Sequence, residues 1–253
     1  MSIEVIDPRI RARRMEVERE AARRRVRITL AVASVVVIVG VAYLVVHSPL
    51  LDVDRVRVEG ARNVSVEAVR AAAAVDVGAP MLLLDAPAVE RRVEDLAWVA
   101  NARVERALPA TVRIVVRERE VTAYVRRDAD TVALLAVDGR VVADAPAAPE
   151  GAVEVVGVRR PPDVGALLSP PDAAGVVRAL PGALAQEVAR VDVAGAGITL
   201  VLTDGVAVRL GSGEDAEAKG AAALAVLERN RGAPLAYVDV RVPEHPVARR
   251  VGA

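Results

Sequence analysis

The feature that most constrains this chain is an apolar run from Ile28 to Val46, which holds 19 residues and no charged side chain. As an α-helix it would span about 28 Å, close to the ~30 Å hydrocarbon core of a bilayer. Thr29, Ser34 and Tyr43 interrupt the run, too few for the polar stripe of a buried core helix. The run is also longer than the ~7–15-residue apolar region of a cleaved signal peptide. We therefore predict a transmembrane helix over residues 28–46.

The charges beside this run predict its orientation. Residues 1–27 carry nine arginines against five acidic residues, and four of the arginines lie close to the run: Arg23, Arg24, Arg25 and Arg27. Because positive charge is retained in the cytoplasm, we expect the N-terminus there and the bulk of the chain outside, a single-pass type II topology in the cell membrane. Residues 1–27 would form a cytoplasmic basic tail. Its arginines either only set the topology or also contact anionic lipid or a cytoplasmic partner.

The residue types needed for most catalytic and metal sites are scarce. The chain has no cysteine, and its two histidines are His47, beside the apolar run, and His245, near the C-terminus. A Ser–His–acid site therefore has one candidate base, a Cys–His site has no cysteine, and a histidine-based zinc site lacks ligands. Carboxylates for sugar cleavage are abundant, but carbohydrate clefts usually offer aromatic platforms, and aromatic residues make up 2% of the chain. We expect no enzymatic activity, no cofactor and no metal.

Overall charge gives no sign of nucleic-acid binding, since 34 basic residues balance 34 acidic ones. The segment after the apolar run mixes strand and helix patterns. Valines alternate with charged residues up to Gly60, which predicts a half-exposed strand. Ser65 is expected to cap one helix and Asp85 a second, with Trp98 in the core at the second helix's end. Two strands follow on either side of Pro109. The predicted order is strand, helix, helix, strand, strand.

The region from residue 120 onward is predicted to be β-rich with helices. The dipeptide Asp138-Gly139 favours a tight hairpin turn. Helices are expected over 214–230 and, more weakly, over 172–180. Further strands are expected at 153–158, 187–193, 198–202, 206–210 and from about 236. Because βαβ units do not repeat along the chain, a doubly wound nucleotide-binding fold is not expected.

The motif Gly211-Ser212-Gly213 lies between a predicted strand and a predicted helix, where it could form a phosphate cradle. The acidic residues Glu214, Asp215 and Glu217 follow at once and would repel a phosphate from the first helical turn. Ser212 with Asp215 three residues later is close to a capping box. We therefore expect Ser212 to cap the helix and the motif to be structural.

A series of short motifs extends from the first strand to the last. They are Val56-x-Val58-x-Gly60, Gly78, Trp98-Val99, Ala102-x-Val104-x-Arg106-x-Leu108-Pro109, Val112-x-Ile114-x-Val116-x-Glu118-Arg119, Ala123, Val137-Asp138-Gly139 and Tyr237-Val238-Asp239-Val240-Arg241. Together they are similar to the FtsQ/DivIB family of bacterial cell division proteins, which carry a polypeptide-transport-associated (POTRA) domain. The arginine-rich composition, with a single lysine, suggests a GC-rich bacterial genome, and the sequence resembles actinobacterial members of the family.

The resemblance implies an α+β fold with a single N-terminal transmembrane helix, a POTRA domain of β-α-α-β-β order and a second β-rich domain with helices. The expected domains are the cytoplasmic basic tail at 1–27, the transmembrane helix at 28–46, the POTRA domain at 50–119 and the β-rich FtsQ-type domain at 120–253.

The resemblance also implies a function. We expect a non-catalytic divisome scaffold at the septum that links early and late division proteins by binding FtsB/DivIC and FtsL, beside other septal membrane proteins and the lipid bilayer. The expected partner-binding residues are Tyr237, Val242, Pro243, Glu244, His245, Pro246, Val247, Ala248, Arg249 and Arg250. A strand edge in this segment could accept a strand from the partner, although its prolines could instead block the edge.

Two other functions remain open at the level of sequence. A membrane-anchored POTRA chaperone for exported polypeptides is the alternative, and an anchored cell-wall enzyme comes third. Promiscuous binding of unfolded strands would indicate the first, and turnover of peptidoglycan fragments the second.

Overall fold

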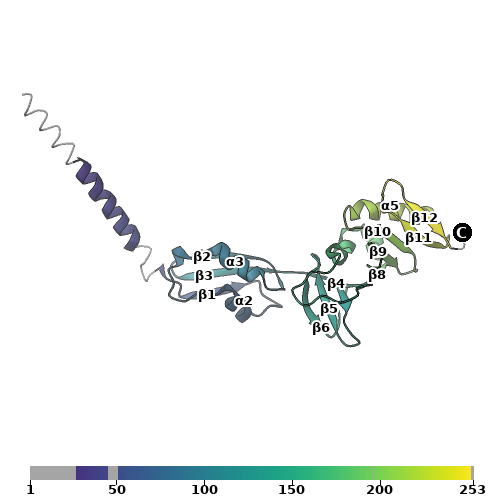
Figure 1. The fold of residues 1–253 in the computed structure, drawn as a ribbon, viewed down its shortest axis with the longest axis horizontal. Helices are drawn as coiled ribbons and strands as arrows, with labels where there is room; N and C mark the ends of the chain where they lie inside the picture. Colours follow the sequence, from purple (N-terminus) through teal and green to yellow (C-terminus); the bar gives the residue numbers. More distant parts are fainter. Residues whose placement is uncertain (1–26, 45–50, 196, 252–253) are drawn as a thin grey trace, which may run out of the picture. The chain divides into compact units, whose positions relative to one another are not determined.

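A computed structural model describes residues 27–44, 51–195 and 197–251 (Figure 1). The first described element is a helix, Arg27–Leu44, with a mean hydropathy of 2.2 and none of its residues buried against protein. An apolar helix of this length without protein around it fits a membrane anchor. The predicted span 28–46 agrees over its described part, whereas residues 45 and 46 and the basic tail before Arg27 lie outside the described residues.

The chain, with this helix included, divides into two compact units. One comprises the residues up to Val56 together with 76–85 and 106–112, and the other comprises 57–75, 86–105 and 113–253. Each unit is compact in itself. The domain boundaries 50–119 and 120–253 stay a prediction.

The first sheet has the order β1-β3-β2 and is accompanied by short helices (Figure 1). Its elements are, in chain order, β1 (Arg55–Glu59), α2 (Val66–Ala73), the 3₁₀ helix η2 (Met81–Leu83), α3 (Ala86–Glu94), β2 (Val99–Ala107) and β3 (Thr111–Glu118). The expected order of strand, helix, helix, strand, strand is confirmed.

Local sequence explains these elements. Ser65 caps α2, since its hydroxyl accepts a hydrogen bond from the Ala68 N–H at 3.0 Å, as predicted. Helix α2 buries Val69 and Ala73. Helix α3 begins directly after Asp85 and buries Val89 and Val93, whose spacing of four residues places them on one face of the helix. Strand β3 buries every second side chain, the pattern of a sheet with one covered face.

The Glu118-Arg119 pair at the end of β3 ties separate backbone segments together. The Glu118 carboxylate accepts hydrogen bonds from the backbone N–H groups of residues 62, 63 and 64 at 2.7, 2.8 and 3.0 Å. Burial raises the pKa of Glu118, but these bonds outweigh it and hold the pKa below 4.5. The Arg119 guanidinium donates to the carbonyls of Ala97 and Val99 and to the Asp138 carboxylate. Glu118 therefore holds the backbone of residues 62–64, and Arg119 holds the backbone around Ala97 and Val99.

The second sheet has nine strands among the described residues, in the order β12-β11-β10-β9-β8-β7-β4-β5-β6. The pairs β10–β11, β4–β7 and β7–β8 are parallel and the others antiparallel. The strands are β4 (Val121–Arg126), β5 (Val132–Ala136), β6 (Val141–Ala145), β7 (Val153–Val156), β8 (Val188–Asp192), β9 (Ile198–Leu202), β10 (Ala207–Gly211), β11 (Leu235–Asp239) and β12 (Val247–Arg250).

Helices cover one face of this sheet. They are the 3₁₀ helices η3 (Pro171–Ala174) and η4 (Val176–Ala179), the single turn α4 (Gly182–Ala185) and the helix α5 (Ala216–Arg229). Their buried side chains, such as Leu184 and Ala223, share one core with strand residues such as Leu200 and Val238. Helix α5 connects the parallel strands β10 and β11 and contacts both, which is the crossover that parallel neighbours need. The predicted β-rich domain with helices is confirmed.

Several local predictions were wrong. The weak helix expected over 172–180 is two 3₁₀ turns, and strand β4, which leads into the second sheet, was not predicted. Trp98 was expected in the core of the first sheet. It is instead half-buried and packs against a cluster on the second sheet made of Val132, Leu134, Ala136 and Val142. Its ring therefore lies outside the core in which we expected it.

Candidate functional site

Strand β12 forms one of the two edges of the nine-stranded sheet. All four of its side chains are exposed. On its inner side it pairs antiparallel with β11, so that Tyr237 lies opposite Arg249. Within the described residues no strand pairs with its outer side. The predicted binding segment 242–250 therefore ends in an open strand edge.

The strand is shorter than expected, because the first part of the predicted segment forms a turn. This part consists of Val242, Pro243, Glu244, His245 and Pro246. The His245 N–H donates a hydrogen bond to the Val242 carbonyl at 3.0 Å and closes the turn. Proline cannot donate to a ladder of strand hydrogen bonds, so the strand begins only after Pro246. These residues lie beside the edge rather than in it.

Tyr237 lies next to this edge on the face of the sheet opposite the helices. Its chain neighbour Val238 is fully buried in the core under α5, and successive side chains of a strand point to opposite faces. The Arg209 guanidinium carbon lies 3.9 Å from the centre of the Tyr237 ring, a cation–π contact. Sequence reasoning missed Arg209, because no sequence signal shows that β10 pairs with β11 across a 14-residue helix.

An ion pair fixes the start of the turn. Arg241 donates from Nη2 to Asp239 Oδ2 at 2.8 Å and from its backbone N–H to Asp239 Oδ1 at 3.2 Å. The side-chain hydrogen bond from Arg241 lowers the pKa of Asp239 below 3.8, even though burial of the carboxyl raises it. Asp239 is therefore charged at neutral pH and holds the chain where β11 ends.

The opposite edge of the same sheet, β6, is covered at its start. The Val141 N–H donates to the Ala166 carbonyl at 2.9 Å, and the Val141 carbonyl accepts from the Gly165 N–H at 2.8 Å. Arg140 and Leu167 form an isolated bridge beside these bonds. The loop 163–167 therefore occupies the outer hydrogen-bonding groups at the start of β6.

Side chains close one edge of the first sheet. Strand β2 lies at that edge, and the carboxylate of Glu90 accepts from the Val104 N–H at 2.8 Å. The Glu94 carboxylate accepts from the Ala102 N–H at 3.0 Å. Two glutamates one helical turn apart on α3 thus occupy donors that an added strand would need.

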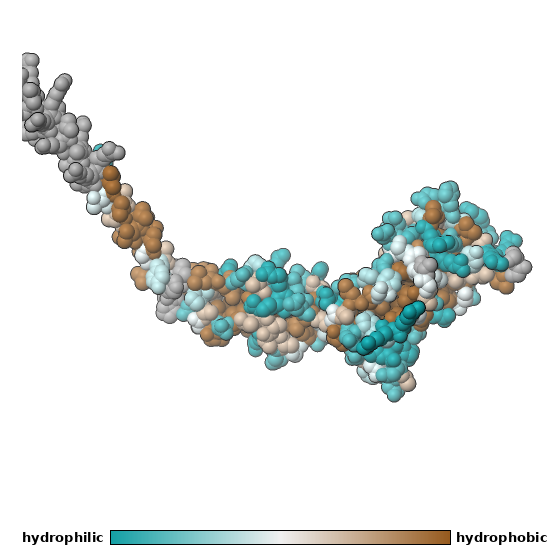
Figure 2. Space-filling view, in the orientation of Figure 1, coloured by the Kyte–Doolittle hydropathy of each residue, from teal (hydrophilic) through white to brown (hydrophobic). Residues whose placement is uncertain are grey.

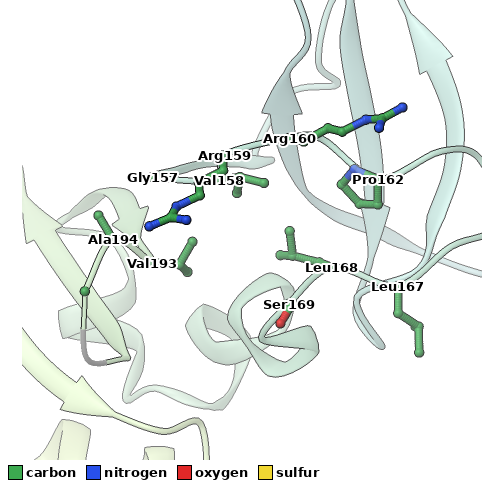
Figure 3. A pocket seen from close by; sticks show the side chains of 11 residues that line it. Gly157, Val158, Arg159, Arg160, Pro162, Leu167, Leu168, Ser169, Val193 and Ala194 are labelled. Atoms are coloured by element: carbon green, nitrogen blue, oxygen red, sulfur yellow. The ribbon is translucent and has the colours of Figure 1, made fainter.

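A hollow of about 780 Å³ lies beyond the carboxyl ends of the parallel strands β7 and β8 (Figure 3). Val158, Leu168 and Val193 line it, with the Arg159 side chain extending toward Val193 and Ala194. The described residues around it include no Asp, Glu, His or Cys. These described lining residues supply no carboxylate, imidazole or thiol as a general acid, general base or metal ligand. No group of three or more metal-binding side chains occurs elsewhere in the described part of the chain.

The Gly211-Ser212-Gly213 motif has a structural role, but not by the predicted cap. Helix α5 begins after Asp215, a residue with φ 54° that has no side-chain cap hydrogen bond. Ser212 instead accepts from the ammonium of Lys219 at both its hydroxyl and its carbonyl, each at 3.1 Å. The Gly213 N–H, which a phosphate would need, donates to the Asp172 carboxylate at 2.5 Å. The Asp172 carboxylate therefore occupies the N–H group that a bound phosphate would use.

Comparisons with known proteins agree with this architecture. Two family models match, "POTRA domain, FtsQ-type" over residues 51–119 and "Cell division protein FtsQ/DivIB, C-terminal" over residues 123–241. A curated relative, the cell division protein FtsQ of Streptomyces collinus, is 33% identical over 237 residues, which cover 89% of each chain. The chain belongs to the FtsQ/DivIB family of cell division proteins.

Other FtsQ relatives match at similar levels. The cell division protein FtsQ of Corynebacterium glutamicum is 30% identical over 208 residues, or 80% of this chain and 90% of the relative. The cell division protein FtsQ of Mycolicibacterium smegmatis is 32% identical over 218 residues, or 85% of this chain, but the match spans only 62% of that longer relative. The predicted FtsQ/DivIB family and the actinobacterial character of the sequence are confirmed. The match to the C-terminal family model ends at Arg241, so β12 lies just beyond the matched residues.

Proposed function

We propose that this chain is a non-catalytic, membrane-anchored scaffold of the division septum that binds FtsB/DivIC- and FtsL-type proteins through the outer edge of β12. The observation that carries the proposal is the state of the sheet edges. Loop 163–167 covers the start of β6, whereas the four exposed residues of β12 present an edge without a described partner strand. A partner segment that adds a strand would satisfy the outer N–H and C=O groups of β12.

Side chains around the edge would give the interaction its specificity. Tyr237, stacked with Arg209, lies one strand inside the edge on the uncovered face. Aromatic and arginine side chains often dominate the energetics of interfaces. The remaining residues of the proposed surface are the turn residues Val242, Pro243, Glu244, His245 and Pro246 and the strand residues Val247, Ala248, Arg249 and Arg250.

The proposal includes the topology. Arg27 opens the apolar helix and further arginines precede it, so the N-terminus would stay in the cytoplasm and both sheets would lie outside. Anchoring confines the sheets to the membrane surface and raises their effective concentration for membrane-bound neighbours. Added protease should therefore digest residues 51–251 in intact protoplasts. Full protection of these residues would contradict this topology and indicate the opposite orientation.

The decisive experiment is a pull-down with the tagged full-length chain from membranes of its own organism, read out by quantitative mass spectrometry. The variant Val247→Asp places a charge in the outer strand, and we expect recovery of the FtsB/DivIC and FtsL pair to fall at least about tenfold. Val164→Asp is the matched control, since Val164 and Val247 are 50% and 57% exposed. Its recovery should equal that of the unmodified chain.

Three outcomes would contradict parts of the proposal. Equal recovery with both variants would remove β12 as the binding edge. Recovery of many unrelated exported chains without division proteins would support the chaperone function instead. Turnover of peptidoglycan fragments by the purified chain would disprove the non-catalytic role.

A further inference from the structure

The first sheet and its helices expose large apolar side chains at one end only. Within residues 51–119 the exposed large hydrophobics are Val77, Leu82, Leu83 and Leu108, with 71%, 41%, 63% and 66% of their surface accessible. All four lie in the segments 76–85 and 106–112, which belong to the same compact unit. We name these four residues the apolar tip.

The apolar tip lies where the chain enters the fold from the anchor helix. The Gly78 N–H donates to the Val53 carbonyl at 2.8 Å, and the Val53 N–H donates to the Ala79 carbonyl at 2.9 Å. The Asp54 N–H donates to the Ala110 carbonyl at 2.8 Å. Both segments of the tip are thus bonded directly to the first folded residues after the anchor. Figure 2 shows brown, hydrophobic surface among the teal surface of the first sheet and its helices.

The fold holds these side chains outward. Met81 is fully buried and opens the 3₁₀ helix that carries Leu82 and Leu83. The Arg106 guanidinium donates to the Met81 carbonyl at 3.0 Å and to the Leu84 carbonyl at 2.7 Å. Leu82 and Leu83 therefore cannot turn into the core without displacing the buried Met81 side chain and breaking the two hydrogen bonds from Arg106. These contacts keep Leu82 and Leu83 exposed in the folded state.

The covalent link limits how far the tip can be from the membrane. Six residues, 45–50, separate the last described residue of the anchor helix from Leu51. Even a fully extended chain of seven Cα steps reaches only about 25 Å. Apolar groups that stay exposed on a folded domain usually mark an interaction site. Because residues 45–50 connect the apolar tip to the anchor helix, the membrane surface always lies within reach of the tip.

We propose that the apolar tip inserts into the boundary between headgroups and acyl chains of the same membrane that holds the anchor helix. This inference needs the anchor but not the partner proposed for β12. The insertion is driven by apolar burial rather than by charge, because aspartates at 52, 54, 76 and 85 outnumber the arginines at 55 and 106 in the segments around the tip. Anionic lipid should therefore not strengthen it, and salt should not weaken it.

The absence of cysteine in the chain allows a direct test. Single variants Leu83→Cys and Leu108→Cys carry an environment-sensitive fluorophore on the full-length chain, reconstituted at low density in phosphatidylcholine vesicles. Quenching is measured with aqueous iodide and with lipids that carry a nitroxide near the top of the acyl chain. Leu167→Cys is the matched control, because Leu167 is 53% exposed and lies in loop 163–167 of the second sheet.

We expect iodide to quench the labels at 83 and 108 at least about threefold less than the label at 167, and nitroxide lipid to quench only the first two. Adding Leu82→Ser and Leu83→Ser to the Leu108→Cys protein should return its label to the iodide quenching of the control. An unchanged melting curve of this variant would show that the fold is intact.

Two results would overturn the proposal. Equal iodide quenching at all three positions would place the tip in water. Protection from iodide without quenching by nitroxide lipid would show that protein, such as a second copy of the chain, covers the tip instead of lipid.

Discussion

The two edges of the nine-stranded sheet differ in whether their outer backbone N–H and C=O groups are paired. At β6 the Val141 N–H and carbonyl are both paired with loop 163–167, and the Val141 side chain is fully buried. At β12 every side chain is exposed and no strand lies outside it among the described residues. Because unprotected edges invite unwanted pairing, proteins usually cover them. An open edge in a sheet whose opposite edge is covered is therefore a candidate binding site for a specific partner.

The largest expected contrast comes from making one substitution at both edges. Val141→Asp would bury a charge among apolar side chains, and we expect it to lower the free energy of unfolding by about 4 kcal/mol or more. Val247→Asp places the same charge in water and should change it by less than about 0.5 kcal/mol. Denaturant unfolding of the two variants measures the difference. Similar losses at both positions would show that β12 is as covered as β6.

A second prediction opens an edge that side chains now close. Glu90→Ala together with Glu94→Ala removes the acceptors of two N–H groups on β2 and should cost about 1–3 kcal/mol of unfolding free energy. The newly open edge should also promote self-association, which sedimentation velocity can detect. Glu150→Ala is the control, because Glu150 is exposed in a loop of the second sheet. A double variant as stable and as monomeric as this control would show that the glutamates do not protect β2.

The smallest effect concerns pH at the turn before the covered edge. Burial raises the pKa of Asp138, but the hydrogen bond from Arg119 and the backbone N–H of Arg140 outweigh it, so the pKa lies below the unfolded value of 3.8. Folding therefore favours the carboxylate. Its stabilisation is complete above pH 3.8 and is lost as the pH falls through the folded pKa.

Asp138 is partly exposed, and solvent screens its ion pair, so the loss should be at most about 1 kcal/mol. Unfolding free energies measured from pH 6 down to pH 2 for the unmodified chain and for Asp138→Asn would reveal it. The two profiles should converge at low pH, and parallel profiles would exclude this contribution.

Sequence predicted well the features that depend on neighbouring residues. The apolar helix, the Ser65 cap and the tight turn at Asp138-Gly139, with Gly139 at φ 81°, are all local. The motifs also sufficed to indicate the family, which two family models confirm. That the predicted partner-binding residues contact a partner stays a prediction.

The failures involve contacts between distant parts of the chain. Ser212 did not cap α5, because Lys219 engages it and Asp172, 41 residues away, takes the Gly213 N–H. Trp98 packs on a strand cluster more than 30 residues later in sequence, as Val132 is its nearest member. The contact of Arg209 with Tyr237 depends on a parallel pairing across α5. Propensity and periodicity carry no information on such pairings.

The position of Lys219 has a practical consequence. It is the single lysine of the chain, only 5% of its surface is accessible, and its ammonium is bonded to Ser212. With cysteine absent as well, the folded sheets offer reagents that acylate amines or alkylate thiols almost no point of attack. Lysine-directed cross-linking would therefore not detect interfaces formed by the folded sheets, and a blank cross-linking map would say nothing about their partners. Carboxylate-directed reagents, or cysteines introduced one at a time, are the chemistry suited to its surface.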